Sequence, residues 1–185
     1  HYTCSMDAQN IFLVGLMAVG KSTVGRQLAD ALTMPFFDAD HEVERRAGAE
    51  ISWIFDVEGE QGFRDREAAV IDDLTQQNGI VLATGGGAIL REENRRHLAE
   101  RGTVIHLDSP IEKIIARTRR DTKRPLLQTA DPAKTLRELQ RSRGPLYAQI
   151  ADHRVITDNR GAGSVTRKIL KILERGGTQH QKTRT

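Results

Sequence analysis

Short apolar runs alternate with helical repeats along most of the chain. Residues 11–14 are all apolar and end at Gly15, a pattern typical of a buried parallel strand. Val24, Leu28 and Leu32 then recur at every fourth position, which predicts an amphipathic helix. The chain therefore starts with a strand, a glycine-rich turn and a helix.

The alternation continues toward the end of the sequence. Further apolar runs predict strands at residues 35–37, 80–83, 104–107 and 154–157. Helical patterns occur at residues 42–47, 92–100, 133–141, 145–151 and 164–174, and another helix is opened by Ser109 and Pro110. This order predicts an α/β fold in which helices cover both faces of a five-stranded parallel sheet.

Two segments interrupt the alternation. Residues 40–78 carry a helical insertion, which we expect Gly59 and Gly62 to break. Residues 119–132 are polar and charged and contain two prolines, so they predict a mobile loop. A length of 185 residues favours one domain. We expect this domain at residues 10–175 and disordered tails at 1–9 and 176–185.

Composition and charge exclude several classes of protein. The 28 Lys and Arg residues against 25 Asp and Glu residues give a net charge of only +3, too small an excess to imply a nucleic-acid partner. No apolar stretch approaches the roughly 18 residues of a membrane-spanning helix. Cys4 is the single cysteine, so an internal disulfide is excluded, and we expect a reducing, cytoplasmic setting.

The turn after the first strand carries a phosphate-binding motif. Residues 15–22 read GLMAVGKS and match G-x-x-x-x-G-K-[ST] between a predicted strand and a predicted helix. Backbone N–H groups and the helix N-terminus would face phosphates, Lys21 would neutralise their charge, and the Ser22 hydroxyl can hold Mg²⁺. An ordinary glycine-rich turn is the alternative. The motif predicts a nucleoside triphosphate site.

Two carboxylates follow the second strand. Asp38 and Asp40 stand two residues apart, and such residues of an extended chain point to the same side. At the carboxyl edge of the sheet, one could support Mg²⁺ while the other polarises an acceptor hydroxyl. The alternative is a solvated turn in which Asp40 caps the following helix.

A second glycine loop predicts a place for a small ligand. Gly85, Gly86 and Gly87 end the third strand, where bare backbone allows close approach, although a tight turn would also need glycine. Arg64 on the insertion could clamp a carboxylate, and Glu67 lies on the same helical surface at i+3.

These motifs together resemble the shikimate kinases, a family with the nucleoside-monophosphate-kinase-like P-loop fold. The resemblance extends from Ile11 to Leu173. It is carried by GLMAVGKSTVGR at 15–26, FFDAD at 36–40, IFDVEGEQGFRDRE at 54–67, ATGGGA at 83–88, RPLL at 124–127 and RGPLYAQIA at 143–151. It implies a three-layer P-loop kinase fold and ATP-dependent phosphorylation of the 3-hydroxyl of shikimate, a step toward chorismate and the aromatic amino acids.

The resemblance also implies roles for individual residues. ATP would be bound by Gly15, Ala18, Val19, Gly20, Lys21, Ser22, Thr23, Arg117, Arg124 and Arg160, with Mg²⁺ at Ser22 and Asp38. Shikimate would be bound by Asp40, Arg64, Gly85, Gly86, Gly87 and Arg143, with Glu67 orienting Arg64. The catalytic residues would be Asp40 as base, Lys21, and Arg124 as an arginine that closes over the transferred phosphoryl group.

Other functions remain alternatives on the sequence. A gluconate kinase would share the phosphate loop, and a catalytically dead, kinase-like binding module would share the fold. The family commonly has glycine and a small residue where this chain has Ala18 and Val19, so the loop is bulkier here. A GTPase is disfavoured because no N-K-x-D motif is present. We expect a monomer that binds ATP and shikimate and no nucleic acid or membrane.

Overall fold

The apolar runs assemble into a central parallel sheet. The computed structural model describes residues 9–119, 129–157 and 160–182, and within these ranges the sheet has five strands in the order β2-β3-β1-β4-β5. The strands are β1 (Asn10–Val14), β2 (Phe36–Asp38), β3 (Val81–Ala83), β4 (Gly102–Asp108) and β5 (His153–Ile156). The predicted five-stranded parallel sheet is confirmed.

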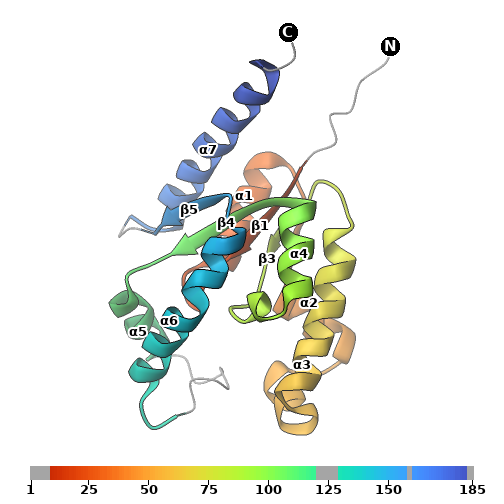
Figure 1. Cartoon of the computed structure of the whole chain (residues 1–185), viewed down its shortest axis with the longest axis vertical. Coiled ribbons are helices and arrows are strands. Elements are labelled where there is room, and N and C mark those ends of the chain that lie inside the picture. Colours follow the sequence, from red (N-terminus) through yellow and green to blue (C-terminus); the bar gives the residue numbers. More distant parts are fainter. Residues whose placement is uncertain (1–8, 120–128, 158–159, 183–185) are drawn as a thin grey trace.

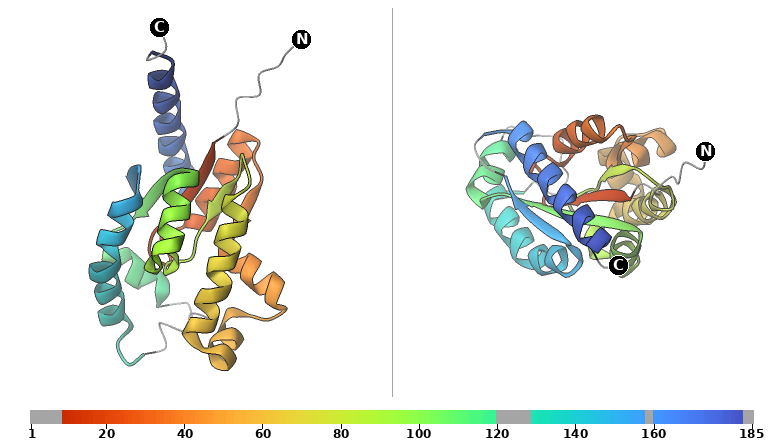
Figure 2. Two further views of the ribbon diagram at one scale, coloured as in Figure 1. Left: turned by 45° about the vertical axis from the view of Figure 1, so that its right-hand side comes forward. Right: turned by 90° about the horizontal axis from the view of Figure 1, so that it is seen from above.

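Helices cover both faces of the sheet. They are α1 (Lys21–Leu32), α2 (Ala39–Ala47), α3 (Ile51–Thr75), α4 (Glu92–Arg101), α5 (Ile111–Thr118), α6 (Pro132–Ile150), α7 (Ala162–Lys182) and the 3₁₀ turn η1 (Ala88–Leu90). Helices α1 and α7 pack together on one face, and α4 and α6 lie on the other (Figures 1 and 2). The predicted three-layer arrangement is therefore confirmed.

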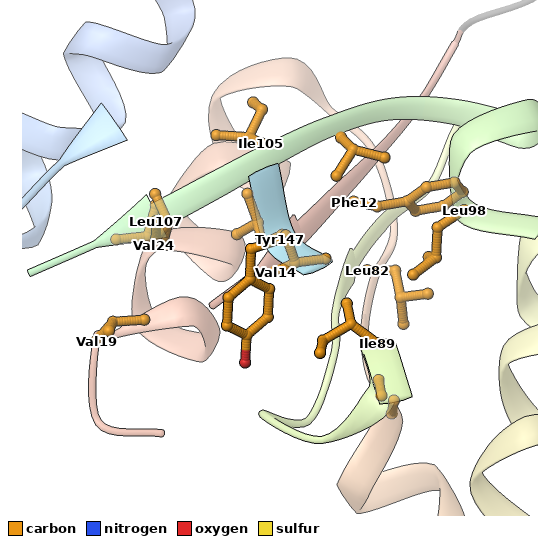
Figure 3. Packing of buried hydrophobic residues seen from close by; sticks show 14 of the residues in the cluster. Phe12, Val14, Val19, Val24, Leu82, Ile89, Leu98, Ile105, Leu107 and Tyr147 are labelled. Carbon is orange, nitrogen blue, oxygen red and sulfur yellow. The ribbon is translucent and has the colours of Figure 1, made fainter. Parts of the chain in front are cut away.

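The hydrophobic core lies between these layers. Phe12, Leu82 and Ile105 come from three neighbouring strands and are fully buried. Leu98 from α4 and Val24 from α1 pack against opposite faces of the strands (Figure 3). Because β1 and β3 are covered on both sides, their sequences are continuous apolar runs instead of alternating ones.

The strand register brings three loops to one edge of the sheet. Ala83, the last residue of β3, pairs with Leu13 of β1 and with Asp38 of β2. The segments that follow β1, β2 and β3 therefore leave the sheet at the same level. This carboxyl edge is where open parallel sheets bind ligands.

The largest departures from the predicted boundaries are in three helices. Helix α2 begins at Ala39, not at residue 42, because the Asp38 carboxylate caps it by accepting from the N–H of His41. Helix α6 runs through Pro145, where two helices were predicted, because its buried face continues past the proline. Helix α7 continues to Lys182, past residue 176, where we expected a tail; its apolar repeat ends at Leu173, so periodicity gave no signal there.

The insertion consists of α2 and α3. Gly59 breaks α3 with φ 75° and ψ 178°, as predicted. The predicted break at Gly62 is wrong, because Gly62 is helical; a Cβ there would lie 2.5 Å from the Cβ of Glu58. Glycine at position 62 thus allows the helix after the kink to pack closely against Glu58, which precedes it. In the described parts of the chain, no helix is both long enough and apolar enough to cross a membrane.

Candidate active site

The phosphate loop joins β1 to α1 in a conformation that needs glycine. Gly15 and Gly20 have φ of 151° and 97°, values that L side chains rarely adopt. A Cβ on Gly15 would also lie 2.3 Å from the carbonyl oxygen of Leu107 on the neighbouring strand. Both glycines of the motif are therefore required by the backbone itself.

Two basic side chains support the loop. The Lys21 ammonium is buried and donates to the carbonyl oxygens of Gly15 and Leu16 at 2.6 and 2.8 Å. Arg117 reaches over from α5 and donates from Nη1 to the carbonyl oxygen of Ala18 at 2.9 Å. Three of the loop's carbonyls thus accept from cations, while the loop's N–H groups are the groups that would bind an anionic ligand.

One cavity of about 530 Å³ adjoins this loop. The predicted site residues among its lining are Ala18, Val19, Gly20, Lys21, Ser22, Thr23, Asp38, Asp40, Gly85, Gly86 and Arg117. The cavity therefore joins the phosphate loop to the ends of β2 and β3. Arg160 is exposed and immediately precedes Gly161, which lines the cavity, and Arg124 lies outside the described residues.

A hydroxyl and a carboxylate meet on the cavity wall. Ser22 Oγ, at the start of α1, donates to Oδ2 of Asp38, at the end of β2. Both are hard oxygen donors of the kind that Mg²⁺ prefers, and Mg²⁺ usually takes its other ligands from water and phosphates. The pair fits a magnesium ion held beside the phosphate loop.

The position of Asp40 corrects the geometric prediction. Asp40 lies in the first turn of α2, not on extended chain, and the residue that caps this helix is Asp38. The carboxylate of Asp40 still lines the cavity, and its Oδ1 would lie 2.7 Å from a Cβ placed on Gly85. The two carboxylates share one cavity, as predicted, but a strand-to-helix junction brings them there.

Two buried arginines flank the glycine loop. Arg64 on α3 pairs through Nη1 with Glu67 Oε1 at 2.9 Å, and these side chains are 7% and 1% exposed. Arg143 approaches from α6 and is 3% exposed. A Cβ on Gly87 would lie 2.3 Å from Arg64 Nη2, and one on Gly86 would lie 3.5 Å from Arg143 Nη1. The absence of a side chain at Gly87 leaves room for the Arg64 guanidinium group, whereas Arg143 lies at ordinary contact distance from Gly86.

The charges at this place are incompletely paired. Arg64 Nε, Arg143 Nη1 and Glu67 Oε2 are buried without a hydrogen-bond partner. Burial raises the pKa of Glu67, which the charge of Arg64 opposes, and burial lowers the pKa of Arg143. Arg64 also pairs with the exposed Glu60 at 3.5 Å, and the buried nitrogens left unpaired on both arginines favour an additional anion, since an unpaired buried charge is costly.

Sequence reasoning missed Tyr147 as part of the site. It lies on α6, is 1% exposed, and its hydroxyl donates to the carbonyl oxygen of Gly86. Its position four residues after Arg143 places both side chains on one face of the helix, and this spacing could have indicated it. Thr84, Thr157 and Val165 also line the cavity without having been predicted.

Comparisons with known proteins agree on one family. Residues 17–174 match the family model described as shikimate kinase (SKI). A shikimate kinase of Vibrio parahaemolyticus is 56% identical over 168 residues, which cover 91% of this chain and 98% of that protein.

Solved structures give the same result. A shikimate kinase from Acinetobacter baumannii in complex with shikimate is 47% identical, with a TM-score of 0.89 over 91% of this chain and 94% of that one. A shikimate kinase from Aquifex aeolicus is 38% identical, with a TM-score of 0.77 over 91% and 98% of the two chains. The family-model match at residues 17–174 includes Lys21, Arg64 and Arg143.

Proposed function

Because the chain belongs to the shikimate kinase family, we propose that it transfers the terminal phosphoryl group of ATP to the 3-hydroxyl of shikimate. The products are ADP and shikimate 3-phosphate, on the route to chorismate. The observation that carries this proposal is the buried pair Arg64 and Arg143, whose guanidinium groups lie against a side-chain-free loop beside the phosphate-loop cavity and each hold a nitrogen without a hydrogen-bond partner. A gluconate kinase is not favoured, given 56% identity to a shikimate kinase.

ATP binds through the phosphate loop in this proposal. The N–H groups of residues 15–22 and the N-terminus of α1 face its phosphates, and Lys21 exchanges its carbonyl contacts for phosphate oxygens. Arg117, which lines the cavity, and Arg160, which precedes the cavity-lining Gly161, would contact the nucleotide. For Arg124, outside the described residues, the proposal rests on the sequence resemblance: its guanidinium neutralises charge on the transferred phosphoryl group.

Ser22 and Asp38 would hold Mg²⁺. When bound, the ion neutralises phosphate charge as the terminal phosphoryl group leaves. The support for this assignment is the direct contact of the two oxygen donors on the cavity wall.

Shikimate binds through its carboxylate in this proposal. The guanidinium groups of Arg64 and Arg143 hold the carboxylate together with the backbone of Gly85–Gly87, and Glu67 fixes the orientation of Arg64. Asp40 lines the cavity beside Gly85, which supports a role in which its carboxylate accepts the proton of the attacking hydroxyl. We also propose that the protein acts as a monomer in the cytoplasm.

A coupled ADP-release assay tests the proposal. Shikimate, gluconate and nucleoside monophosphates are compared side by side as acceptors, with ATP and Mg²⁺ in excess. We expect shikimate to give much the highest kcat/KM. Faster turnover of gluconate would favour the other small-molecule kinase, and no acceptor-dependent ADP release at all would favour a catalytically inactive binding module.

A further inference from the structure

We propose that Tyr147 is a positioning residue for the acceptor site, because it fixes the peptide between Gly86 and Gly87 in one of two accessible orientations. This inference rests on the proposed function, since it assigns that peptide to the binding of shikimate.

The glycine loop contains a β-turn. The N–H of Ala88 donates to the carbonyl oxygen of Gly85 at 3.1 Å, so Gly86 and Gly87 are the central residues. Gly87 has φ −95° and ψ 5°, the values of the third residue in a type I turn. A type II turn differs by rotation of the central peptide and requires positive φ at the third position, which glycine adopts readily. Both turn types are therefore open to this sequence.

Tyr147 contacts the atom that distinguishes the two turns. Its hydroxyl donates to the carbonyl oxygen of Gly86, which belongs to the central peptide. Carbonyl and N–H groups of one trans peptide point in opposite directions. Holding the Gly86 oxygen toward α6 therefore directs the N–H of Gly87 away from α6. Rotation to type II would break the Tyr147 contact and reverse that N–H.

The tyrosine is itself held in place. Its ring stacks on His106 of β4, with centroids 4.9 Å apart and planes at 25°. Figure 3 shows the ring beside Val14 and Ile89, with the hydroxyl directed away from the apolar side chains. Burial raises the pKa of Tyr147 well above its usual value, so the hydroxyl remains a hydrogen-bond donor at physiological pH.

The same hydroxyl group lies beside Arg143. Burial lowers the pKa of Arg143, and the neighbouring Tyr147 opposes this effect. Tyr147 thus acts on two of the groups assigned to the acceptor carboxylate: the glycine backbone and one guanidinium. Both groups are assigned to the acceptor carboxylate, so the expected consequence is on acceptor binding.

The substitution Tyr147→Phe tests this role because it keeps the ring and its stacking and removes only the hydroxyl. We expect the KM for shikimate to rise about tenfold, as for the loss of one buried hydrogen bond, with the KM for ATP unchanged.

The matched control is Thr75→Val, which removes another buried hydroxyl that donates to a backbone carbonyl, that of Ile71 at 2.7 Å. Thr75 lies at the opposite edge of the sheet, where Asn10 begins β1. We expect it to lower the melting temperature and leave both KM values unchanged. Wild-type KM for shikimate in Tyr147→Phe, or an equal rise of both KM values, would overturn the role of Tyr147. If the wild-type enzyme does not phosphorylate shikimate, the proposed function is wrong, and the role of Tyr147 that rests on it is wrong as well.

Discussion

A single methyl group at Gly87 should displace Arg64. A Cβ there would lie 2.3 Å from Nη2 and 2.6 Å from Cζ, closer than Cβ atoms come to other groups in real proteins. The backbone would not resist the change, because φ −95° and ψ 5° are open to alanine. The effect of Gly87→Ala must therefore act through the guanidinium group.

The size of the effect follows from that contact. Restoring van der Waals separation requires the guanidinium to move by about 1 Å, and the group has little free space because it is buried and paired with Glu67. Misplacement of a binding group by about 1 Å can cost about a hundredfold in rate. We expect kcat/KM for shikimate to fall by about that factor, which corresponds to about 2.7 kcal/mol.

Initial rates of ADP release measure this prediction, with shikimate varied at saturating ATP and ATP varied at saturating shikimate. The KM for ATP should stay within about twofold of wild type, since the phosphate loop is untouched. Gly176→Ala is the matched control, because a Cβ at this helical position meets no atom within 4 Å. It should leave every kinetic constant unchanged. Gly87→Ala with wild-type kcat/KM for shikimate would refute the placement of Arg64 at the acceptor.

Three further predictions concern other parts of the molecule. Thr33 ends α1 with φ 55° and ψ 46°, so Thr33→Gly should increase the free energy of unfolding in urea by about 1 kcal/mol; a decrease would contradict the strain. Burial lowers the pKa of His106 in the folded protein, so folding favours the neutral ring. This contribution to the free energy of unfolding is complete above the ordinary histidine pKa of 6.5 and is lost as the pH falls below it. Between pH 8 and pH 5, the melting temperature of His106→Phe should therefore fall less than that of the wild type. Equal decreases would contradict this role of His106. Asp40→Asn should lower kcat by about 10² to 10⁴ with ATP binding nearly unchanged, whereas wild-type kcat would remove Asp40 as the base.

The phosphate loop could be predicted because all its determinants are local. The apolar run before Gly15, the motif that ends in Lys21 and Ser22, and the fourfold repeat after it lie within one short segment. The parallel sheet followed from the same kind of evidence, since buried strands are continuous apolar runs. The pairing of Arg64 with Glu67 was likewise readable as an i, i+3 contact on one helix.

The remaining features depend on contacts that the sequence does not display. Tyr147 donates to a backbone carbonyl 61 residues away, and Arg117 donates to another that is 99 residues away. Carbonyl groups are present at every position, so no residue type marks them as partners. The start of α2 depended on which of two aspartates capped it, and Asp38 took that role because β2 ends there.

The central claim is that two buried guanidinium groups bind the carboxylate of the acceptor. The most direct test compares shikimate with its uncharged methyl ester as acceptors for the wild-type enzyme in the ADP-release assay. Hydrogen bonds to charged groups contribute about 1.5 to 3 kcal/mol each, so loss of the charge should lower kcat/KM by at least about a hundredfold. Equal kcat/KM values for the acid and the ester would contradict the claim.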